Sequence, residues 1–505
     1  MLKKRGAGVL FHISSMPSPY GIGVFGKNTK NFIDKLCEMG FTYWQVLPFN
    51  PTDNSNSPYC SPSAFAGNYL FINPEYLCET GLIGEADVKA NLYEGSPYTA
   101  DYEFAAEKRL TTLKKAFLNI TDSILKEIKK FETENPWVTD YSLFMAAKEA
   151  EGGKPWWQWN KSFSHYSTCV QNTASLADAA AFWTFVQYIF FKQWHKIKEY
   201  ANEKGIAVIG DMPIYVAMDS VDVWANLPQF LIDEKTLKPE KVAGVPPDYF
   251  SEDGQLWGNP IYDWKKMKKD GYSWWISRLK TALETYDVVR IDHFRAFASY
   301  WEVPADAETA KTGEWKSGPK MDFFSKVFEA FPDAPIIAED LGSFGEDVVQ
   351  LLEETGFPGM KVVQFGFDPN SDSSHLPHNA VPNSINYVGT HDNNTILGWL
   401  WEADEEERKF ALDYIGFTGD NWGDGGYYSP SCRKVIEAVW KSASNVAILS
   451  FQDMCGFGSD ARMNRPGIPE ENWRFRTTED TLNSIDFSYF RHINSIFRRM
   501  YPVFD

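Results

Sequence analysis

Acidic residues end four of the short apolar runs that we predict to be buried strands. These strand-end residues are Asp211, Asp292, Glu339 with Asp340, and Asp392 after His391. Carboxylates that meet at one place repel each other unless some are protonated, paired with a cation or used in catalysis. If these strands lie side by side, the cluster indicates acid–base or nucleophilic chemistry.

One of these carboxylates has a cation nearby in the sequence. Arg290 precedes Asp292 by two residues, and alternate residues of a strand point to the same side, so the guanidinium can keep this carboxylate ionised. An ionised carboxylate beside a protonated one is the pair that retaining glycosidases use. One attacks the anomeric carbon and the other protonates the leaving oxygen.

Each candidate also has an ordinary structural interpretation. An Asp at a strand end can cap the next helix, and Arg290 with Asp292 can be a structural ion pair. His391 can be a hydrogen-bonded loop residue, and the aromatic residues Tyr59 and Trp257 can be packing residues instead of sugar platforms. Four acidic strand ends together make capping alone a poor explanation.

The elements that would position these residues follow a regular pattern. Eight short β-branched or apolar runs alternate with helical patterns, which predicts an α/β protein with a TIM (β/α)8 barrel and a site at the carboxyl ends of its strands. The predicted strands are residues 7–13, 43–48, 207–213, 288–294, 335–340, 360–365, 385–391 and 446–453. The predicted helices between them are 28–38, 180–203, 323–330, 345–354 and 434–442.

Two long gaps between predicted strands indicate large insertions into one catalytic barrel that spans residues 1–505. Helical periodicity at 104–130 and 141–151 predicts that 49–206 contain an inserted, largely helical subdomain. Turn-forming sequences in 214–270 predict an inserted loop region over the active-site cleft.

Composition excludes several classes of partner. The net charge of −19, from 49 Lys and Arg against 68 Asp and Glu, repels phosphate backbones, so we expect no nucleic acid partner. No apolar run is long enough to span a bilayer, so we expect no membrane association. The six cysteines lie far apart without a C-x-x-C pair, which favours a cytoplasmic protein with reduced thiols and no zinc site. Aromatic residues in Gly/Pro-rich segments suit the apolar faces of sugars, although most aromatic residues fill cores.

Several sequence blocks, in their order and spacing, resemble the amylomaltase and disproportionating-enzyme family, glycoside hydrolase family 77, nearly from end to end. The blocks include Gly21-Ile22-Gly23, Trp44-Gln45-Val46-Leu47-Pro48, Ser57-Pro58-Tyr59, Gly210-Asp211-Met212-Pro213, Pro246-Pro247-Asp248-Tyr249-Phe250, Arg290-Ile291-Asp292-His293-Phe294, Ala338-Glu339-Asp340-Leu341-Gly342, Gly389-Thr390-His391-Asp392-Asn393 and Asn472-Trp473-Arg474. The resemblance implies a 4-α-glucanotransferase without cofactor or metal. Such an enzyme moves α-1,4-glucan segments to the 4-hydroxyl of a glucose or glucan acceptor with retention.

The same resemblance implies roles for individual residues. Asp292 corresponds to the nucleophile, Glu339 to the general acid/base and Asp392 to the residue that stabilises the oxocarbenium-like transition state. The implied substrate-binding residues are Ser57, Tyr59, Asp211, Tyr249, Phe250, Gln255, Trp257, Arg290, His391 and Asn464. The chain departs from the family where Asn394 stands in place of a common Asp.

Three other functions remain open from the sequence. A retaining α-glucan hydrolase would share all three acids and differ in its acceptor region. A non-catalytic glucan-binding protein would not need the acids. A phosphate-using barrel would need a Gly-rich loop near the last strands, for which Gly456-Phe457-Gly458 is a weak candidate.

Overall fold

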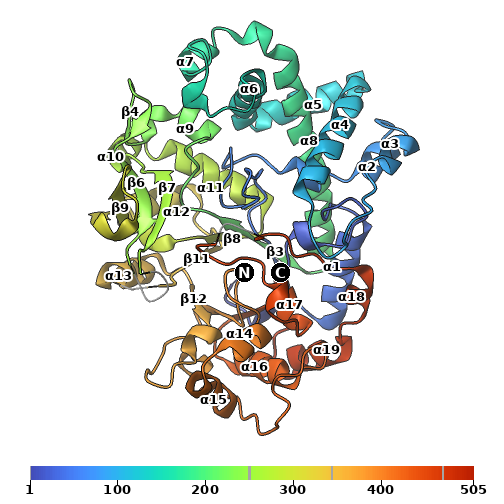
Figure 1. Cartoon of the computed structure of the whole chain (residues 1–505), viewed down its shortest axis with the longest axis vertical. Helices are drawn as coiled ribbons and strands as arrows, with labels where there is room; N and C mark the ends of the chain where they lie inside the picture. Colours follow the sequence, from blue (N-terminus) through green and yellow to red (C-terminus); the bar gives the residue numbers. More distant parts are fainter. Residues whose placement is uncertain (1, 248–251, 343–344, 469–470, 505) are drawn as a thin grey trace.

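A computed structural model describes residues 2–247, 252–342, 345–468 and 471–504. Its central sheet has eight parallel strands in the order β11-β8-β3-β2-β1-β14-β13-β12 (Figure 1). The strands are β1 (Gly6–Leu10), β2 (Tyr43–Gln45), β3 (Ala207–Met212), β8 (Val288–Ile291), β11 (Ile336–Ala338), β12 (Gly359–Val362), β13 (Ser384–Tyr387) and β14 (Val446–Ser450). The eight predicted strands are confirmed. Each ends before the predicted boundary, because the predicted runs include the first residues of the following loops.

The outer strands β11 and β12 close the sheet into a barrel. The Ala338 N–H donates to the Pro358 carbonyl (3.0 Å), and the Met360 N–H donates to Asp340 Oδ1 (2.6 Å). A buried carboxylate thus takes the place of a ladder carbonyl. Gly359 allows this approach, since a Cβ at that position would lie 2.4 Å from the Asp340 carboxylate.

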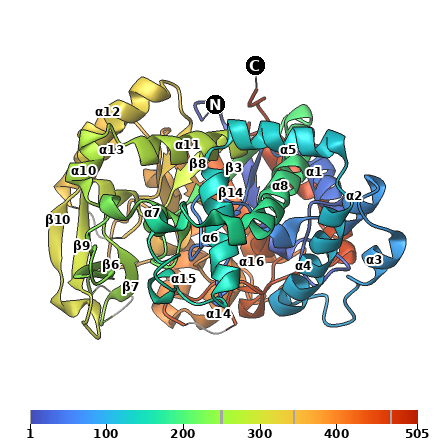
Figure 2. The same cartoon turned by 90° about the horizontal axis from the view of Figure 1, so that it is seen from above.

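Helices cover the outside of the barrel, as Figure 2 shows from a second direction. They include α1 (Lys27–Met39), α8 (Ala177–Glu203), α11 (Ser273–Thr285), α12 (Lys320–Ala330), α13 (Glu346–Thr355), α14 (Ile396–Glu402), α15 (Glu405–Tyr414), α16 (Pro430–Lys441), α17 (Phe451–Met454), α18 (Glu479–Asn483) and α19 (Phe487–Ile496). Both faces of the barrel strands are therefore buried, except in β12, where Gly359 and Lys361 are partly exposed. This burial explains the nearly continuous apolar runs in the sequence.

Between β2 and β3 the chain forms a helical region that Figure 1 shows along the upper side of the molecule. Its helices are α2 (Pro74–Glu79), α3 (Glu85–Lys89), α4 (Tyr102–Leu118), α5 (Asp122–Glu134), α6 (Trp137–Ala150) and α7 (Tyr166–Cys169). The long periodicity expected at 104–130 is interrupted by Thr121, whose hydroxyl accepts the Ile124 N–H (3.4 Å) and starts α5.

Between β3 and β8 the structure contains more regular elements than a loop. They are α9 (Val221–Ala225), β4 (Ile232–Asp233), β5 (Lys238–Pro239), β6 (Lys241–Val245), β7 (Gln255–Pro260) and α10 (Trp264–Lys269). Strands β6 and β7 join β9 (Ser299–Pro304) and β10 (Glu314–Ser317) in an antiparallel sheet of order β10-β9-β6-β7. This sheet crosses the expected boundary at residue 270, because two of its strands follow β8.

The opposite end of the barrel is sealed by a buried arginine. Arg499 donates to the carbonyls of Gly6 (3.1 Å), Ser444 (3.1 Å) and Trp440 (3.0 Å), among others. Met500 also forms an antiparallel bridge with Gly6. In the described ranges, no helix is long and apolar enough to cross a membrane.

The closure at Asp340 predicts a stability effect. Asp340→Ala leaves the buried Met360 N–H without its acceptor, so the free energy of unfolding should fall by about 1–3 kcal/mol in urea titrations. Asp333→Ala is the matched control, because Asp333 is exposed in the loop between α12 and β11, and it should change the free energy of unfolding by less than about 0.5 kcal/mol. Equal unfolding midpoints for the two variants would contradict this account of closure.

Candidate active site

A single guanidinium holds two of the strand-end carboxylates at the barrel mouth. Arg290 Nη1 lies 2.7 Å from both carboxylate oxygens of Asp211 and 3.0 Å from Asp292 Oδ1. Residues 209 and 211 of β3 and residues 288 and 290 of β8 alternate toward the barrel interior, which brings these groups together. Asp211 therefore forms an ion pair, and its carboxylate is occupied by Arg290 and Tyr59.

Tyr59 extends this network toward the surface. Its hydroxyl donates to Asp211 Oδ2 (2.8 Å), and its ring stacks on His391 with centroids 5.1 Å apart. Burial raises the pKa of Tyr59 well above its ordinary value, so the phenol stays a donor. Ser57 fixes the approach of Tyr59, because the Ser57 hydroxyl accepts the Tyr59 N–H (3.2 Å).

Glu339 is held by two backbone donors. The His293 N–H donates to Oε2 and the Leu341 N–H donates to Oε1, both at 2.7 Å. His293 has φ = 52°, a left-handed conformation that a non-glycine residue rarely adopts. This backbone strain, of the kind that gathers at functional sites, turns the His293 N–H toward Glu339 directly after Asp292.

The environments of Asp292 and Glu339 separate their pKa values. Burial raises both, to about 6 for Asp292 and about 8 for Glu339. The Arg290 guanidinium, in contact with Asp292, opposes the rise there, whereas the charge of Asp292 raises the pKa of Glu339 further. Near neutral pH this arrangement favours an ionised Asp292 beside a protonated Glu339.

Asp392 lies in the loop after β13 and is the most exposed of the three acids. Its side chain is 47% exposed, against 29% for Asp292. Asn464 Nδ2 donates to Asp392 Oδ1 (2.6 Å), and His391 Nε2 lies 3.4 Å from the same oxygen. The loop thus brings Asp392, His391 and Asn464 together, next to Tyr59.

Asn394, where the resemblance leads us to expect Asp, fits its surroundings in this chain. Its Nδ2 donates to Glu402 Oε2 and to Ser459 Oγ, both at 2.9 Å. An ionised Asp at this position would place a second carboxylate against Glu402 and would lack the N–H group that Asn394 donates to the Glu402 carboxylate. The departure is therefore compensated locally.

Trp257 packs against His293, whose N–H holds Glu339. Its ring stands edge-on to His293 with centroids 4.8 Å apart, and its Nε1–H donates to Gln255 Oε1 (3.1 Å). The indole is 37% exposed, so part of its surface is available for contact. The candidates Tyr249 and Phe250, which precede this strand, lie outside the described residues.

Two further site residues, Trp473 and Arg462, received no role from the sequence. Trp473 packs its indole against Tyr59 (5.7 Å) and His391 (5.8 Å) from a backbone with φ = 67°. Arg462 donates to the Asp392 carbonyl (2.6 Å). The block Asn472-Trp473-Arg474 was a signal for Trp473, and the contacts of both residues depend on how distant loops meet.

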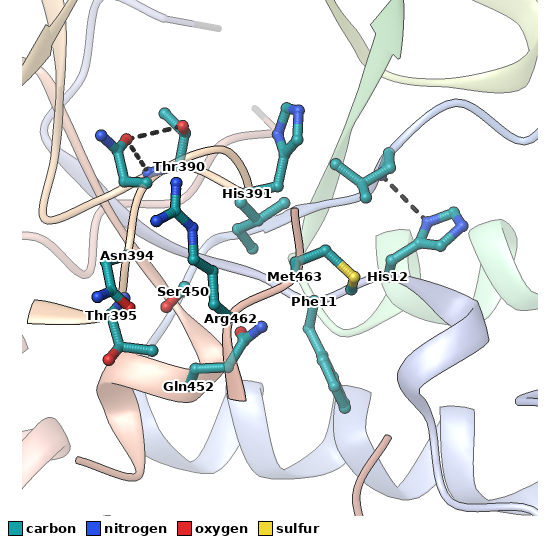
Figure 3. A pocket seen from close by; sticks show the side chains of 13 residues that line it. Phe11, His12, Thr390, His391, Asn394, Thr395, Ser450, Gln452, Arg462 and Met463 are labelled. Carbon is teal, nitrogen blue, oxygen red and sulfur yellow. Dashed lines mark hydrogen bonds between the residues drawn. The ribbon is translucent and has the colours of Figure 1, made fainter. Parts of the chain in front are cut away.

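The candidates for other chemistry have structural explanations. A Cβ at Gly456 would lie 2.3 Å from the Gly426 carbonyl, so this glycine serves a close approach of two loops. Among the described residues, no group of three or more His, Cys, Asp or Glu is arranged to hold a metal ion. A cavity of about 20 Å³ lies beside His391 and is lined by Arg462, Thr390, Phe11 and Met463, among others (Figure 3).

Comparison with known proteins identifies similar chains over almost the full length. The profile of glycoside hydrolase family 77, described as 4-alpha-glucanotransferase, matches residues 11–482. A 4-alpha-glucanotransferase of Clostridium butyricum is 42% identical over 480 residues, which are 94% of this chain and 96% of that protein. One from Streptococcus pneumoniae is 42% identical over 507 residues, covering 99% of this chain and 98% of that protein.

Solved structures give the same result for the fold. The amylomaltase from Streptococcus agalactiae in complex with acarbose has a TM-score of 0.93 and 38% identity, and the match covers 98% of this chain and 100% of that one. The amylomaltase from Corynebacterium glutamicum has a TM-score of 0.77 at 19% identity over 98% of this chain and 75% of that one. This second match supports the fold alone.

The buried ion pairs of Arg290 predict a pH-dependent loss of stability. Arg290→Met leaves buried carboxylates without their cation and should lower the free energy of unfolding by about 3–5 kcal/mol at pH 7. Loss of the guanidinium raises the pKa of Asp292 further above its unfolded value, so the folded variant gains protons more readily. The difference in the free energy of unfolding between the wild type and Arg290→Met should therefore shrink as the pH falls through the raised pKa of Asp292.

Urea unfolding at several pH values between neutral and mildly acidic measures this effect. Arg491→Met is the control, because the Arg491 guanidinium is exposed and donates to the Glu38 carbonyl. A deficit for Arg290→Met that stays constant over this pH range would contradict the electrostatic explanation.

Proposed function

This chain belongs to the 4-alpha-glucanotransferases of glycoside hydrolase family 77, and we propose that Asp292, Glu339 and Asp392 carry out its glucan transfer. Its activity is the transfer of segments of α-1,4-glucan to an acceptor glucose or glucan with retention. The observation that carries the assignment of roles is the opposite environment of Asp292 and Glu339. Arg290 contacts the first, whereas burial and a neighbouring negative charge favour the protonated form of the second.

In the first step the donor glucan loses its leaving segment. Glu339 protonates the glycosidic oxygen while Asp292 attacks the anomeric carbon, which forms a β-glucosyl ester on Asp292. The bond to the leaving 4-oxygen breaks as the bond to the carboxylate forms. Glu339 then carries the negative charge, close to the His293 and Leu341 N–H donors that stabilise it.

In the second step an acceptor replaces the leaving segment. Ionised Glu339 takes the proton of the acceptor 4-hydroxyl, whose oxygen attacks the anomeric carbon and releases Asp292. Two inversions give net retention. The positive charge that develops on the sugar in both steps is stabilised by Asp392, which Asn464 and His391 orient.

The aromatic groups divide between the two sides of these acids. Tyr59, stacked on His391, supplies a flat surface beside the reacting glucose, with Ser57 and Asp211 fixing its position. Gln255 and Trp257, with Tyr249 and Phe250, supply the acceptor side. An acceptor sugar held there is placed for attack and limits access of water, which favours transfer over hydrolysis.

The proposed substrates are maltooligosaccharides, starch or glycogen fragments, and glucose. Acarbose, bound in the amylomaltase from Streptococcus agalactiae, is a reasonable ligand for this chain as well. We place the protein in the cytoplasm, a proposal supported by six free cysteine thiols. We also propose the division of the single barrel into inserted regions at 49–206 and 214–270.

Maltotriose tests the reaction and the nucleophile together. The purified protein should convert it into a ladder of longer maltodextrins with some glucose, and Asp292→Asn should lower the initial rate by at least about 10⁴-fold, because the covalent step loses its nucleophile. Asp306→Asn, at an exposed position, is the matched control and should retain full activity. Chromatography of the products follows both.

Each other outcome of this experiment points to a different function. Glucose and maltose without longer products would identify a retaining hydrolase instead. No reaction with any α-glucan would leave a glucan-binding role. Full activity of Asp292→Asn would remove Asp292 from the chemistry.

The two carboxyl environments predict a bell-shaped dependence of kcat/KM on pH. Activity should fall as the pH drops through the pKa of Asp292, about 6, because the nucleophile becomes protonated. It should also fall as the pH rises through the pKa of Glu339, about 8, because the acid loses its proton. Initial transfer rates from maltotriose at low substrate concentration measure the profile.

Glu339→Gln separates the two limbs when α-maltosyl fluoride is the donor, since fluoride leaves with little help from an acid. The rate at which this variant forms the glycosyl enzyme should still fall at acidic pH, because Asp292 becomes protonated, but it should no longer fall at alkaline pH. An unchanged alkaline limb would show that another group sets it.

A further inference from the structure

Asp392 must be held in place by groups other than its own packing. Of the three acids it has the most exposed side chain, and it lies in the loop after β13, whereas Asp292 and Glu339 directly follow β8 and β11. Its carboxylate contacts Asn464 and His391, which are themselves loop residues. The orientation of the Asp392 carboxylate therefore depends on how firmly its loop is connected to the segment that carries Asn464.

Arg462 makes that connection. Its Nε–H donates to the Asn464 carbonyl (2.8 Å), and its Nη2–H donates to the Asp392 carbonyl (2.6 Å). The Asn464 N–H donates in turn to the His391 carbonyl (3.1 Å). Together with the bond from Asn464 Nδ2 to Asp392 Oδ1, these contacts form a closed ring that joins the two segments.

The side chain of Arg462 lines the small cavity beside His391. Figure 3 shows it extending from its loop toward Thr390, and Ser450 and Gln452 line the same small cavity. The residue is half-buried, and both of the hydrogen bonds described above end on backbone carbonyls. The guanidinium thus holds the backbone of the two segments that carry Asp392 and Asn464.

We propose that Arg462 is a positioning residue that fixes Asp392 and Asn464 relative to each other during transfer, an inference that rests on the proposed function. An arginine suits this task because Nε and Nη2 lie in one plane and donate in parallel to two acceptors. The ammonium of a lysine keeps the charge but has no such fixed fork. Arg462 need not touch the glucan, and it acts through Asp392.

Substitution at this position separates charge from geometry. Arg462→Lys should lower kcat by about 100-fold with a small change in KM, because a transition-state contact misplaced by about 1 Å costs that much. Arg462→Met, which removes the charge as well, should lose at least as much. Arg465→Met is the control, since Arg465 is exposed on the same segment and its side chain donates to the Ser459 carbonyl (3.3 Å).

A cycle with Asp392→Asn distinguishes positioning from a general structural role. Rates of glycosyl-enzyme formation from α-maltosyl fluoride are measured for the wild type, both single variants and the double variant, with the melting temperature of each. If Arg462 acts through Asp392, Arg462→Lys should cost about 100-fold in the wild type and less than about 3-fold in the Asp392→Asn background. Acarbose binding to Arg462→Met measures the site independently of turnover.

The results separate the failure of this inference from the failure of the proposed function. Equal losses from Arg462→Lys in the two backgrounds, or wild-type kcat in a folded Arg462→Lys, would overturn the positioning role. If Arg462→Lys does not fold, the same criterion applies to Arg462→Met. Full activity of Asp392→Asn itself would instead contradict the role proposed for Asp392.

Discussion

The ion pairs of Arg290 are the constraint on which the rest of the site depends. The barrel brings four acidic residues to one mouth, where low dielectric strengthens their repulsion. One guanidinium, buried between β3 and β8, compensates Asp211 and Asp292 at once. Asp211 can then accept the Tyr59 hydroxyl, which sets the position of the ring on His391. A charge in the barrel interior therefore fixes both a carboxylate and an aromatic surface.

The remaining acids are positioned by backbone groups. Glu339 accepts two N–H donors, one of them from the strained His293, and Asp392 belongs to a loop whose carbonyls are held by Arg462. Backbone donors keep their positions because the strands beneath them are fully buried. The site combines rigid strand ends with loops that carry strain, as at His293 and Trp473.

Local patterns in the sequence were sufficient to predict the barrel. A buried parallel strand appears in the sequence as an apolar run, and an acidic residue at or after its end is a second signal. Strands β3, β8, β11 and β13 could therefore be predicted together with their acidic residues. The antiparallel sheet of β6, β7, β9 and β10 could not, because its strands lie on both sides of β8. Its pairing is a property of the folded chain.

The candidate site shows the same division. Arg290 and Asp292 are two residues apart at the end of β8, so their contact follows from alternation. Arg462 binds backbone carbonyls, which every residue has, so no partner in the sequence identifies its role. The role of Asn394 likewise depends on Glu402, the last residue of α14, whose carboxylate meets Asn394 only once that helix has formed.

The pairing of β1 with β14 has a consequence for how the protein is made. Val446, the partner of Gly6, lies 440 residues further along the chain. At a translation rate of about 5–20 residues per second, the first strand waits about 20–90 s on the ribosome for this neighbour. During that time one edge of β1 is open to other nascent chains. The hydrogen bonds of Arg499, at the opposite end of the barrel, form later still. The barrel that supports the catalytic charges is therefore closed and sealed only after synthesis has passed Arg499.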